Sequence, residues 1–174
     1  MSRAYIPLIV FFFFVIEGTL FQLFVPHHHE WSYVFVPRFM IVFIILIGIH
    51  FTRPVSLVYG LIVGVIYDVV YTQLLGAYIF GFALIGYFFV FPYKRVQDMF
   101  LVQLVIIIAA LVFFEYYQYG LYALIGLTDI EHRVFLQERV LTSVVLNTAF
   151  AILIYFPFLK LMQYVQKQEM VRNR

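Results

Sequence analysis

Long continuous runs of apolar residues dominate this chain and limit the folds that it can adopt. Six such runs cover residues 4–25, 34–51, 55–71, 77–91, 99–125 and 140–164. A run of about 20 apolar residues is typical of a helix that spans a membrane. The strands of a transmembrane β-barrel would instead alternate apolar and polar residues. The sequence therefore predicts an all-α, polytopic membrane protein with six transmembrane helices in one compact bundle, forming a single domain over residues 1–174.

The composition excludes several other classes of protein. Of 174 residues, 65% are hydrophobic and 11% are charged, whereas soluble proteins have roughly 45–50% and 25%. A water-soluble surface cannot be built from this inventory, and an aromatic content of 21% excludes a disordered chain. The chain has no cysteine, which excludes disulfides, thiolate zinc sites and iron–sulfur clusters. A net charge of only +2 gives no reason to expect nucleic acid as a partner; the expected partner is the lipid bilayer.

The distribution of lysine and arginine predicts the orientation of the six helices. Eight basic residues would lie on one side of the membrane: Arg3, Arg53, Lys94, Arg95, Lys160, Lys167, Arg172 and Arg174. Three would lie on the other: Arg38, Arg133 and Arg139. Because basic residues concentrate in cytoplasmic loops, both termini are expected in the cytoplasm. The asymmetry would be lost without the second span, which is the weakest because its uncharged part runs only from Phe39 to Ile49.

Four polar residues fall within the predicted spans, where such residues are rare and costly. They are Glu17, Asp68, Glu115 and Asn147. With a rise of about 1.5 Å per residue, all four lie at a similar level in the outer half of the membrane, which predicts a shared polar patch or an outward-opening cavity. Two interpretations remain open at this point. The acids are protonated and hydrogen-bond neighbouring helices, or they form a ligand site.

Nearby residues offer partners for these acids. Arg38 and Arg139 lie near the outer boundary and could pair with one of them. Glu115 also shares a helix face with three polar residues that could satisfy it: Gln118, Tyr119 and Tyr122.

The third apolar run carries small residues on one face. Gly60, Gly64 and Asp68 are spaced by four residues, and a Gly-x-x-x-Gly pattern allows two helices to approach closely. Ala77 and Gly81 form a similar small face on the next run. We therefore expect a hairpin packed inside the bundle, with Asp68 directed towards protein. If Asp68 only hydrogen-bonds a neighbouring helix, asparagine is expected to replace it.

Two loop motifs carry weaker signals. The His27–His29 tract resembles a metal-binding tract, but adjacent residues point in different directions, so an extracytoplasmic loop without metal is expected, with Trp31 and Tyr33 at the membrane interface. Thr128 and Glu131 have the spacing of a capping box, which predicts that a helix begins there.

No catalytic pattern is found in the spans. They contain Ser56 and Ser143, and His50 lies at the cytoplasmic edge, far from Ser143. Zinc-protease, P-loop and nucleotide-binding signatures are absent from the sequence. The chain is therefore not expected to be an enzyme or to hold a cofactor.

The segment from Gly60 to Asp68, which reads Gly-Leu-Ile-Val-Gly-Val-Ile-Tyr-Asp, is followed by Leu75-Gly76 and preceded by Arg53-Pro54. With the chain length, the hydropathy and the basic C-terminal tail, this segment resembles the MreD family of rod shape-determining proteins. The resemblance implies a bacterial cytoplasmic-membrane protein of the cell-elongation (rod) complex, acting in lateral peptidoglycan synthesis. The implied partners are MreC, through it RodA and a class B penicillin-binding protein, and indirectly MreB.

The fold of that family is similar to the substrate-binding subunits of energy-coupling-factor vitamin transporters, which gives an alternative function. Those subunits also have six helices and an outward-facing ligand cavity. They dock their coupling protein through an Ala-x-x-x-Ala motif in the first helix, whereas Ala4 here has no second alanine at that spacing. A channel or exporter would show a repeated half or a broken helix, and neither is found.

Overall fold

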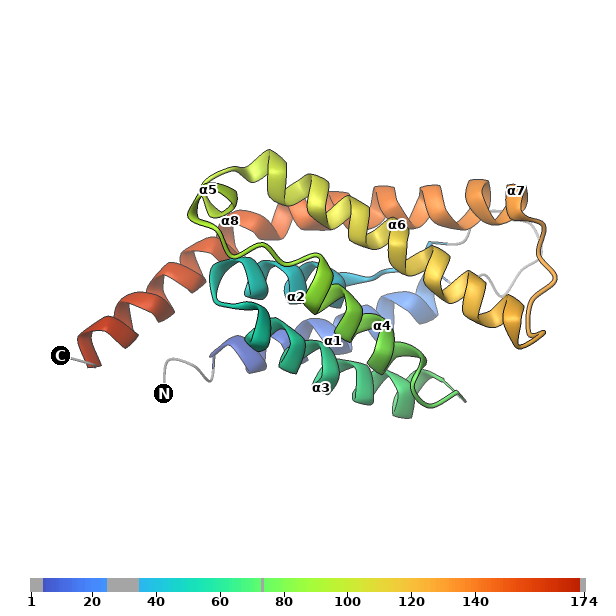
Figure 1. Ribbon diagram of the computed structural model, residues 1–174, viewed down its shortest axis with the longest axis horizontal. Helices are drawn as coiled ribbons and strands as arrows, with labels where there is room; N and C mark the ends of the chain where they lie inside the picture. The colour runs from blue at the N-terminus through green and yellow to red at the C-terminus, as the bar shows by residue number, and fades with distance from the viewer. Residues whose placement is uncertain (1–4, 25–34, 73, 173–174) are drawn as a thin grey trace.

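The computed structural model describes residues 5–24, 35–72 and 74–172, and the regular structure within these ranges is helical (Figure 1). The His27–His29 tract, Trp31 and Tyr33 lie outside the described residues. The longer helices within these ranges are α1 (Tyr5–Phe24), α2 (Phe39–His50), α3 (Arg53–Tyr71), α4 (Ala77–Phe88), α6 (Phe100–Leu124) and α8 (Leu141–Arg172). The short α5 (Lys94–Gln97) connects α4 to α6, whereas α7 (His132–Val134) and the π-helical turn η2 (Phe135–Val140) lead into α8.

Helix α2 lies at the centre of the bundle. Every residue from Phe39 to His50 is buried, as expected for a helix that is apolar on all sides. It contacts α1, α3, α4, α6 and α8, which surround it in Figure 1. The stacked rings of Phe39 and Phe150, with centroids 3.8 Å apart, join α2 to α8. The core is therefore built around the span that is weakest in the sequence.

Three stretches are long and apolar enough to cross a membrane: α3, α6 and the continuous segment His132–Val165. Helices α2 and α4 have 12 residues each, or roughly 18 Å, against an apolar slab of about 30 Å. The expected helix over residues 34–51 is thus too long, because Phe35–Arg38 is not helical. Pro37 explains this, since the residue before a proline disfavours helix. Irregular backbone is tolerated at membrane depth where protein covers it, and Val36 is buried.

The glycines of α3 pack against the backbone of α4, as expected. A Cβ on Gly60 would lie 2.7 Å from the Phe82 carbonyl oxygen, and a Cβ on Gly64 would lie 2.6 Å from the Cα of Ile79. The two helices can therefore approach closely only because neither position has a side chain.

The matching glycine on α4 differs from the expected one. Gly86 faces α3, since its Cβ would lie 3.0 Å from the Ser56 carbonyl oxygen. Gly81 instead faces α6, where its Cβ would lie 2.7 Å from the ring of Phe114. Five residues along a helix correspond to a rotation of about 140°, so the two glycines face different neighbours.

The expected capping box is wrong. The helix begins at His132, and the Thr128 hydroxyl accepts from the Ile130 amide at 3.5 Å instead of from Glu131. The Tyr119 hydroxyl donates to the Ile130 carbonyl at 2.9 Å, which holds this segment extended against the end of α6. Gly126, with φ at +71°, ends α6 just before it.

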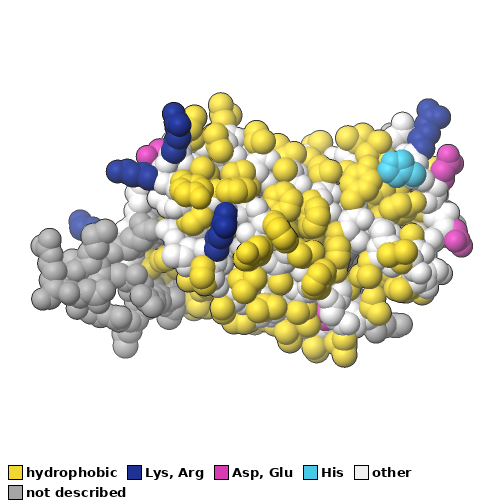
Figure 2. Space-filling model, in the orientation of Figure 1, with side chains coloured by type: hydrophobic (Ala, Val, Ile, Leu, Met, Phe, Trp, Pro, Cys, Tyr) yellow, Lys and Arg dark blue, Asp and Glu magenta, His cyan; other side chains and the backbone are white. Residues whose placement is uncertain are grey.

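Apolar side chains cover most of the face in Figure 2, and most of the charged side chains on it lie towards its two ends. This distribution fits a protein whose long axis crosses a membrane. Helix α8 extends beyond the expected end at residue 164 and changes direction near its C-terminal end in Figure 1. Pro157 accounts for a bend there, because proline removes one helical hydrogen bond.

Candidate functional site

Two polar side chains cap the start of α2, although neither belongs to that helix. The Met40 amide donates to Glu17 Oε2 at 3.1 Å, and the Arg38 amide donates to Asn147 Oδ1 at 2.6 Å. The first amides of a helix have no partner within the helix, and inside a membrane water cannot serve them. Glu17 of α1 and Asn147 of α8 therefore satisfy the first amides of α2 within the protein interior.

The backbone of the non-helical segment Phe35–Arg38, before α2, is also hydrogen-bonded by side chains of α8. The Val36 carbonyl oxygen accepts from the Asn147 amide group at 2.9 Å and from the Ser143 hydroxyl at 3.2 Å. Ser143 and Asn147 are one turn apart on α8 and fully buried. Asn147 thus donates to and accepts from the same stretch of backbone, because an amide side chain carries both a donor group and an acceptor oxygen.

Glu115 is bridged by two arginines. Arg38 Nε lies 3.1 Å from its Oε1, and Arg139 Nε lies 3.1 Å from its Oε2. The side chains of Arg38 and Glu115 are 4% and 0% exposed, whereas that of Arg139 is 32% exposed. The Ser143 hydroxyl donates to Oε1 at 3.2 Å. The prediction that these arginines pair with an acid agrees with this geometry.

The remaining bonds of Arg38 reach two other helices. Nη1 donates to the Tyr78 hydroxyl at 2.7 Å and Nη2 donates to Gln118 Oε1 at 2.5 Å. The guanidinium also lies 5.0 Å from the centroid of the Phe114 ring, within the range of a cation–π contact. A buried cation of this kind is tolerated because each of its three nitrogens has a hydrogen-bond partner and one of these partners is a carboxylate.

The expected satisfaction of Glu115 by residues of its own helix is wrong. Gln118 bonds Arg38, and the Tyr119 hydroxyl bonds the Ile130 carbonyl. Two guanidinium groups occupy both carboxylate oxygens, so Glu115 forms its ion pairs with other elements. The π-helical turn η2, which carries Arg139, is the feature that sequence inspection missed; such wide turns occur often at functional sites.

Asp68 caps the start of α4. Its Oδ2 accepts from the amides of Gly76 at 2.8 Å and Ile79 at 3.2 Å, and its Oδ1 accepts from the Tyr78 amide at 2.9 Å. Gly76 makes this possible through a φ of +104°, a conformation that side-chain-bearing residues rarely adopt. The Asp68 side chain is directed towards protein, as expected, and the residue is 1% exposed.

The four intramembrane polar residues are brought together only in part. Glu17, Glu115 and Asn147 all meet the segment around Arg38. Asp68 is separate and connects to that segment through Tyr78, whose amide bonds Asp68 and whose hydroxyl accepts from Arg38. The geometry accounts for these side chains first as helix caps and ion-pair partners.

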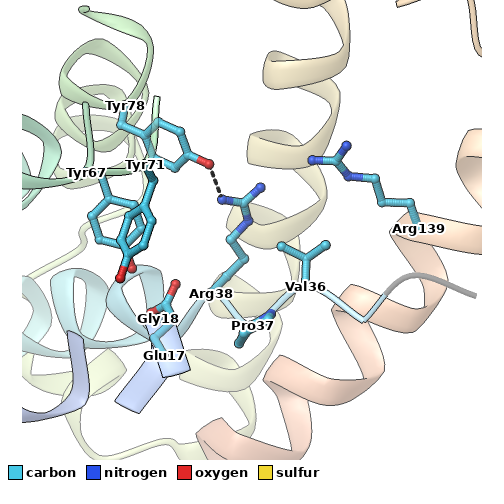
Figure 3. A pocket seen from close by; sticks show the side chains of 9 residues that line it. All are labelled: Glu17, Gly18, Val36, Pro37, Arg38, Tyr67, Tyr71, Tyr78 and Arg139. Atoms are coloured by element: carbon cyan, nitrogen blue, oxygen red, sulfur yellow. Dashed lines mark hydrogen bonds between the residues drawn. The ribbon is translucent and has the colours of Figure 1, made fainter. Parts of the chain in front are cut away.

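A pocket of about 130 Å³ opens beside this network. Figure 3 shows Glu17, Tyr67, Tyr71 and Tyr78 on one side of it and Arg139 on the other. Its lining residues come from α1, the non-helical segment before α2, α3, α4 and η2: Glu17, Gly18, Val36, Pro37, Arg38, Tyr67, Tyr71, Tyr78 and Arg139.

Among the described residues, no cluster of three or more Asp, Glu, His or Cys side chains is arranged so that it could hold a metal ion. The two buried serines donate to carbonyl oxygens, Ser56 to Ile44 and Ser143 to Val36. His50 Nδ1 lies 2.9 Å from the Leu46 carbonyl oxygen at the opposite end of α2 from Ser143. Within the described ranges these serines and this histidine are therefore not arranged for nucleophilic chemistry.

Comparison with known proteins agrees with the motif around Asp68. The family model of the rod shape-determining protein MreD matches residues 2–165. The rod shape-determining protein MreD of Bacillus subtilis (strain 168) is 28% identical over 158 residues, which is 91% of this chain and 92% of that protein. No solved structure matches this chain. A match over nearly the whole length shows that the chain belongs to the MreD family of rod shape-determining proteins.

Proposed function

We propose that this chain is a non-enzymatic component of the bacterial cell-elongation (rod) complex, needed for rod shape and for lateral peptidoglycan synthesis. The observation that carries the proposal is the MreD family match over residues 2–165. In this role the protein binds MreC, supports RodA and its class B penicillin-binding partner, and connects indirectly to MreB.

The proposed topology is a single domain that crosses the bacterial cytoplasmic membrane six times, with both termini in the cytoplasm. The predicted eight-to-three division of basic residues supports it. The polar caps of α2 and α4 also support it, because a short helix that starts within the membrane needs its first amides satisfied by protein. The non-helical segments next to these helices would complete their crossings.

The proposed role of the small-residue face is structural support for partner binding. Gly60, Gly64 and Gly81 hold α4 between α3 and α6, while Gly76 and Asp68 fix the start of α4. This arrangement leaves large apolar side chains exposed on α1 and α3, such as Phe11 at 62% and Ile62 at 55%, where lipid or the membrane helix of MreC would pack.

Depletion of the protein in its own bacterium tests the proposal. Cells are expected to widen and lose rod shape, and a plasmid-borne copy of the gene is expected to restore their width. MreC should copurify with the tagged full chain from the rescued cells. Normal width after verified depletion would contradict the proposal, and a selective loss of vitamin uptake would favour the transporter alternative.

A further inference from the structure

Glu17 is a buried carboxylate with spare capacity to accept hydrogen bonds. It is 4% exposed, and its Oε2 caps the Met40 amide. Within the described residues no ion pair involves Glu17, because Arg38 and Arg139 both pair with Glu115. A buried carboxylate at the wall of a polar pocket is therefore left without a cation of its own.

Two tyrosine hydroxyls point towards the same place. The Tyr67 hydroxyl lies beside the Glu17 carboxylate, is buried, and forms no well-formed hydrogen bond with a described residue. Tyr67 as a whole is 4% exposed. In Figure 3 the hydroxyls of Tyr67 and Tyr71 are both directed towards Glu17. Arg38 and Arg139 also line the pocket, and both guanidinium groups pair with Glu115. The remaining lining presents one carboxylate, two phenol oxygens and the faces of aromatic rings.

The space beside Tyr71 depends on a glycine. A Cβ on Gly18 would overlap the Tyr71 hydroxyl, so any other residue there would displace this ring from the pocket. The pocket volume of about 130 Å³ is well above the roughly 10–15 Å³ that one ordered water needs on the same measure. The pocket therefore has room for a short polar group, such as a two-carbon amine.

We propose that this pocket binds a primary ammonium group on a short arm, of the size and chemistry of ethanolamine. The ammonium would donate to Glu17 and to the hydroxyls of Tyr67 and Tyr71, and the tyrosine rings would add cation–π attraction. The group can come from the headgroup of phosphatidylethanolamine or from a free amine. A quaternary ammonium such as choline lacks N–H donors and should bind less well.

Thermal unfolding of the purified full chain in detergent tests this proposal. One arm adds phosphatidylethanolamine or phosphatidylcholine with the same acyl chains, and a second adds ethanolamine or choline chloride at equal ionic strength. Because a ligand that binds only the folded state raises Tm in a concentration-dependent way, the titrations give apparent affinities. The two pocket variants are Tyr71→Phe and Glu17→Gln, and the second keeps an acceptor for the Met40 amide. The control is Tyr155→Phe, because Tyr155 lies outside the pocket and its hydroxyl accepts from Gln103.

The lipid source would be supported by a larger Tm increase with phosphatidylethanolamine than with phosphatidylcholine. In that case Glu17→Gln and Tyr71→Phe should each weaken the apparent affinity for phosphatidylethanolamine about tenfold or more, and Tyr155→Phe should not. The same pattern with ethanolamine against choline, without a lipid preference, would support a free amine. Equal responses to the primary and quaternary amines in both arms, or equal affinities for wild type and both pocket variants, would overturn the proposal. If Glu17→Gln does not fold, Tyr71→Phe alone decides.

Discussion

The hydrogen bonds of Asp68 require a side chain with two acceptor oxygens at this position. Three backbone amides converge on its two oxygens, so every one of these bonds requires an acceptor. An asparagine has one acceptor oxygen and would turn its NH₂ group towards at least one of the amides. The geometry therefore argues against the expectation that asparagine replaces Asp68 without loss.

Asp68→Asn is expected to destabilise the protein by about 1–3 kcal/mol, the cost of a buried donor left without a partner. Asp68→Leu should cost more, because it leaves all three amides unsatisfied. Chemical or thermal unfolding in detergent measures both, and Asp98→Asn, at an exposed position, is the matched control. A stability of Asp68→Asn equal to wild type would show that these amides do not need the carboxylate.

The ion pairs of Glu115 give a second prediction. Glu115→Gln would leave two guanidinium groups facing each other across a buried site, and removal of one partner of a buried ion pair typically costs about 3–5 kcal/mol. A large fall in Tm is expected, against little change for Glu131→Gln on the exposed loop. Replacement of Arg139, which is 32% exposed, should cost less than replacement of Glu115. A reversed order would contradict the assignment of Glu115 as the centre of the network.

Sequence inspection identified the polar residues of this network but not how they connect. Their presence within apolar runs was visible because such residues are rare there. Arg38 and Arg139 could be named as candidate partners, but not the acid that they pair with, because Arg38 and Glu115 are 77 positions apart and only the folded bundle brings them together. The capping role of Glu17 depends on where α2 begins, and the apolar run over residues 34–51 conceals that point.

At the scale of the elements, the contact between α3 and α4 depends on the absence of side chains. Gly64→Ala would place a Cβ 2.6 Å from backbone of α4, which cannot move without displacing the helix. We expect a clear fall in Tm, and for Gly64→Ile a loss of folded protein or of copurified MreC. Gly120→Ala on α6, where nothing lies within 4 Å of the added Cβ, is the control and should be neutral or slightly stabilising. Equal Tm values for Gly64→Ala and Gly120→Ala would contradict this packing role.

The boundaries of the elements were predictable where the chain is punctuated and not elsewhere. Arg53-Pro54 marks the start of α3, since proline is favoured in the first turn of a helix. Gly81 was expected to face α3 but faces α6. Spacing alone shows which residues share a helix face, but not which neighbouring helix that face contacts. No sequence pattern predicts the π-helical turn η2. Its effect, which is to place Arg139 beside Glu115, is visible only in the folded bundle.

At the scale of the whole molecule, the arrangement of the helices leads to a topology prediction. If all six longer helices cross the membrane, the turn before α4 and the loop after α6 lie outside the cell, and α5 and the C-terminal part of α8 lie inside. Because the chain has no cysteine, single cysteines can report each position without background. Leu75 and Leu127, which are 75% and 67% exposed, are suitable outer sites, and the exposed Lys94 and Lys160 are suitable inner sites.

In spheroplasts, a membrane-impermeant maleimide is expected to label Leu75→Cys and Leu127→Cys, but to label Lys94→Cys and Lys160→Cys only after permeabilisation. The reason is that Leu75 reaches the outside only if α3 crosses, and Lys94 returns to the inside only if the short α4 and the segment after it cross as well. Each variant must retain the width of rod-shaped cells, so that the labelled protein is the functional one. Labelling of Leu75→Cys only after permeabilisation would show that the α3–α4 hairpin does not reach the outer surface, and the six-crossing topology would then be wrong.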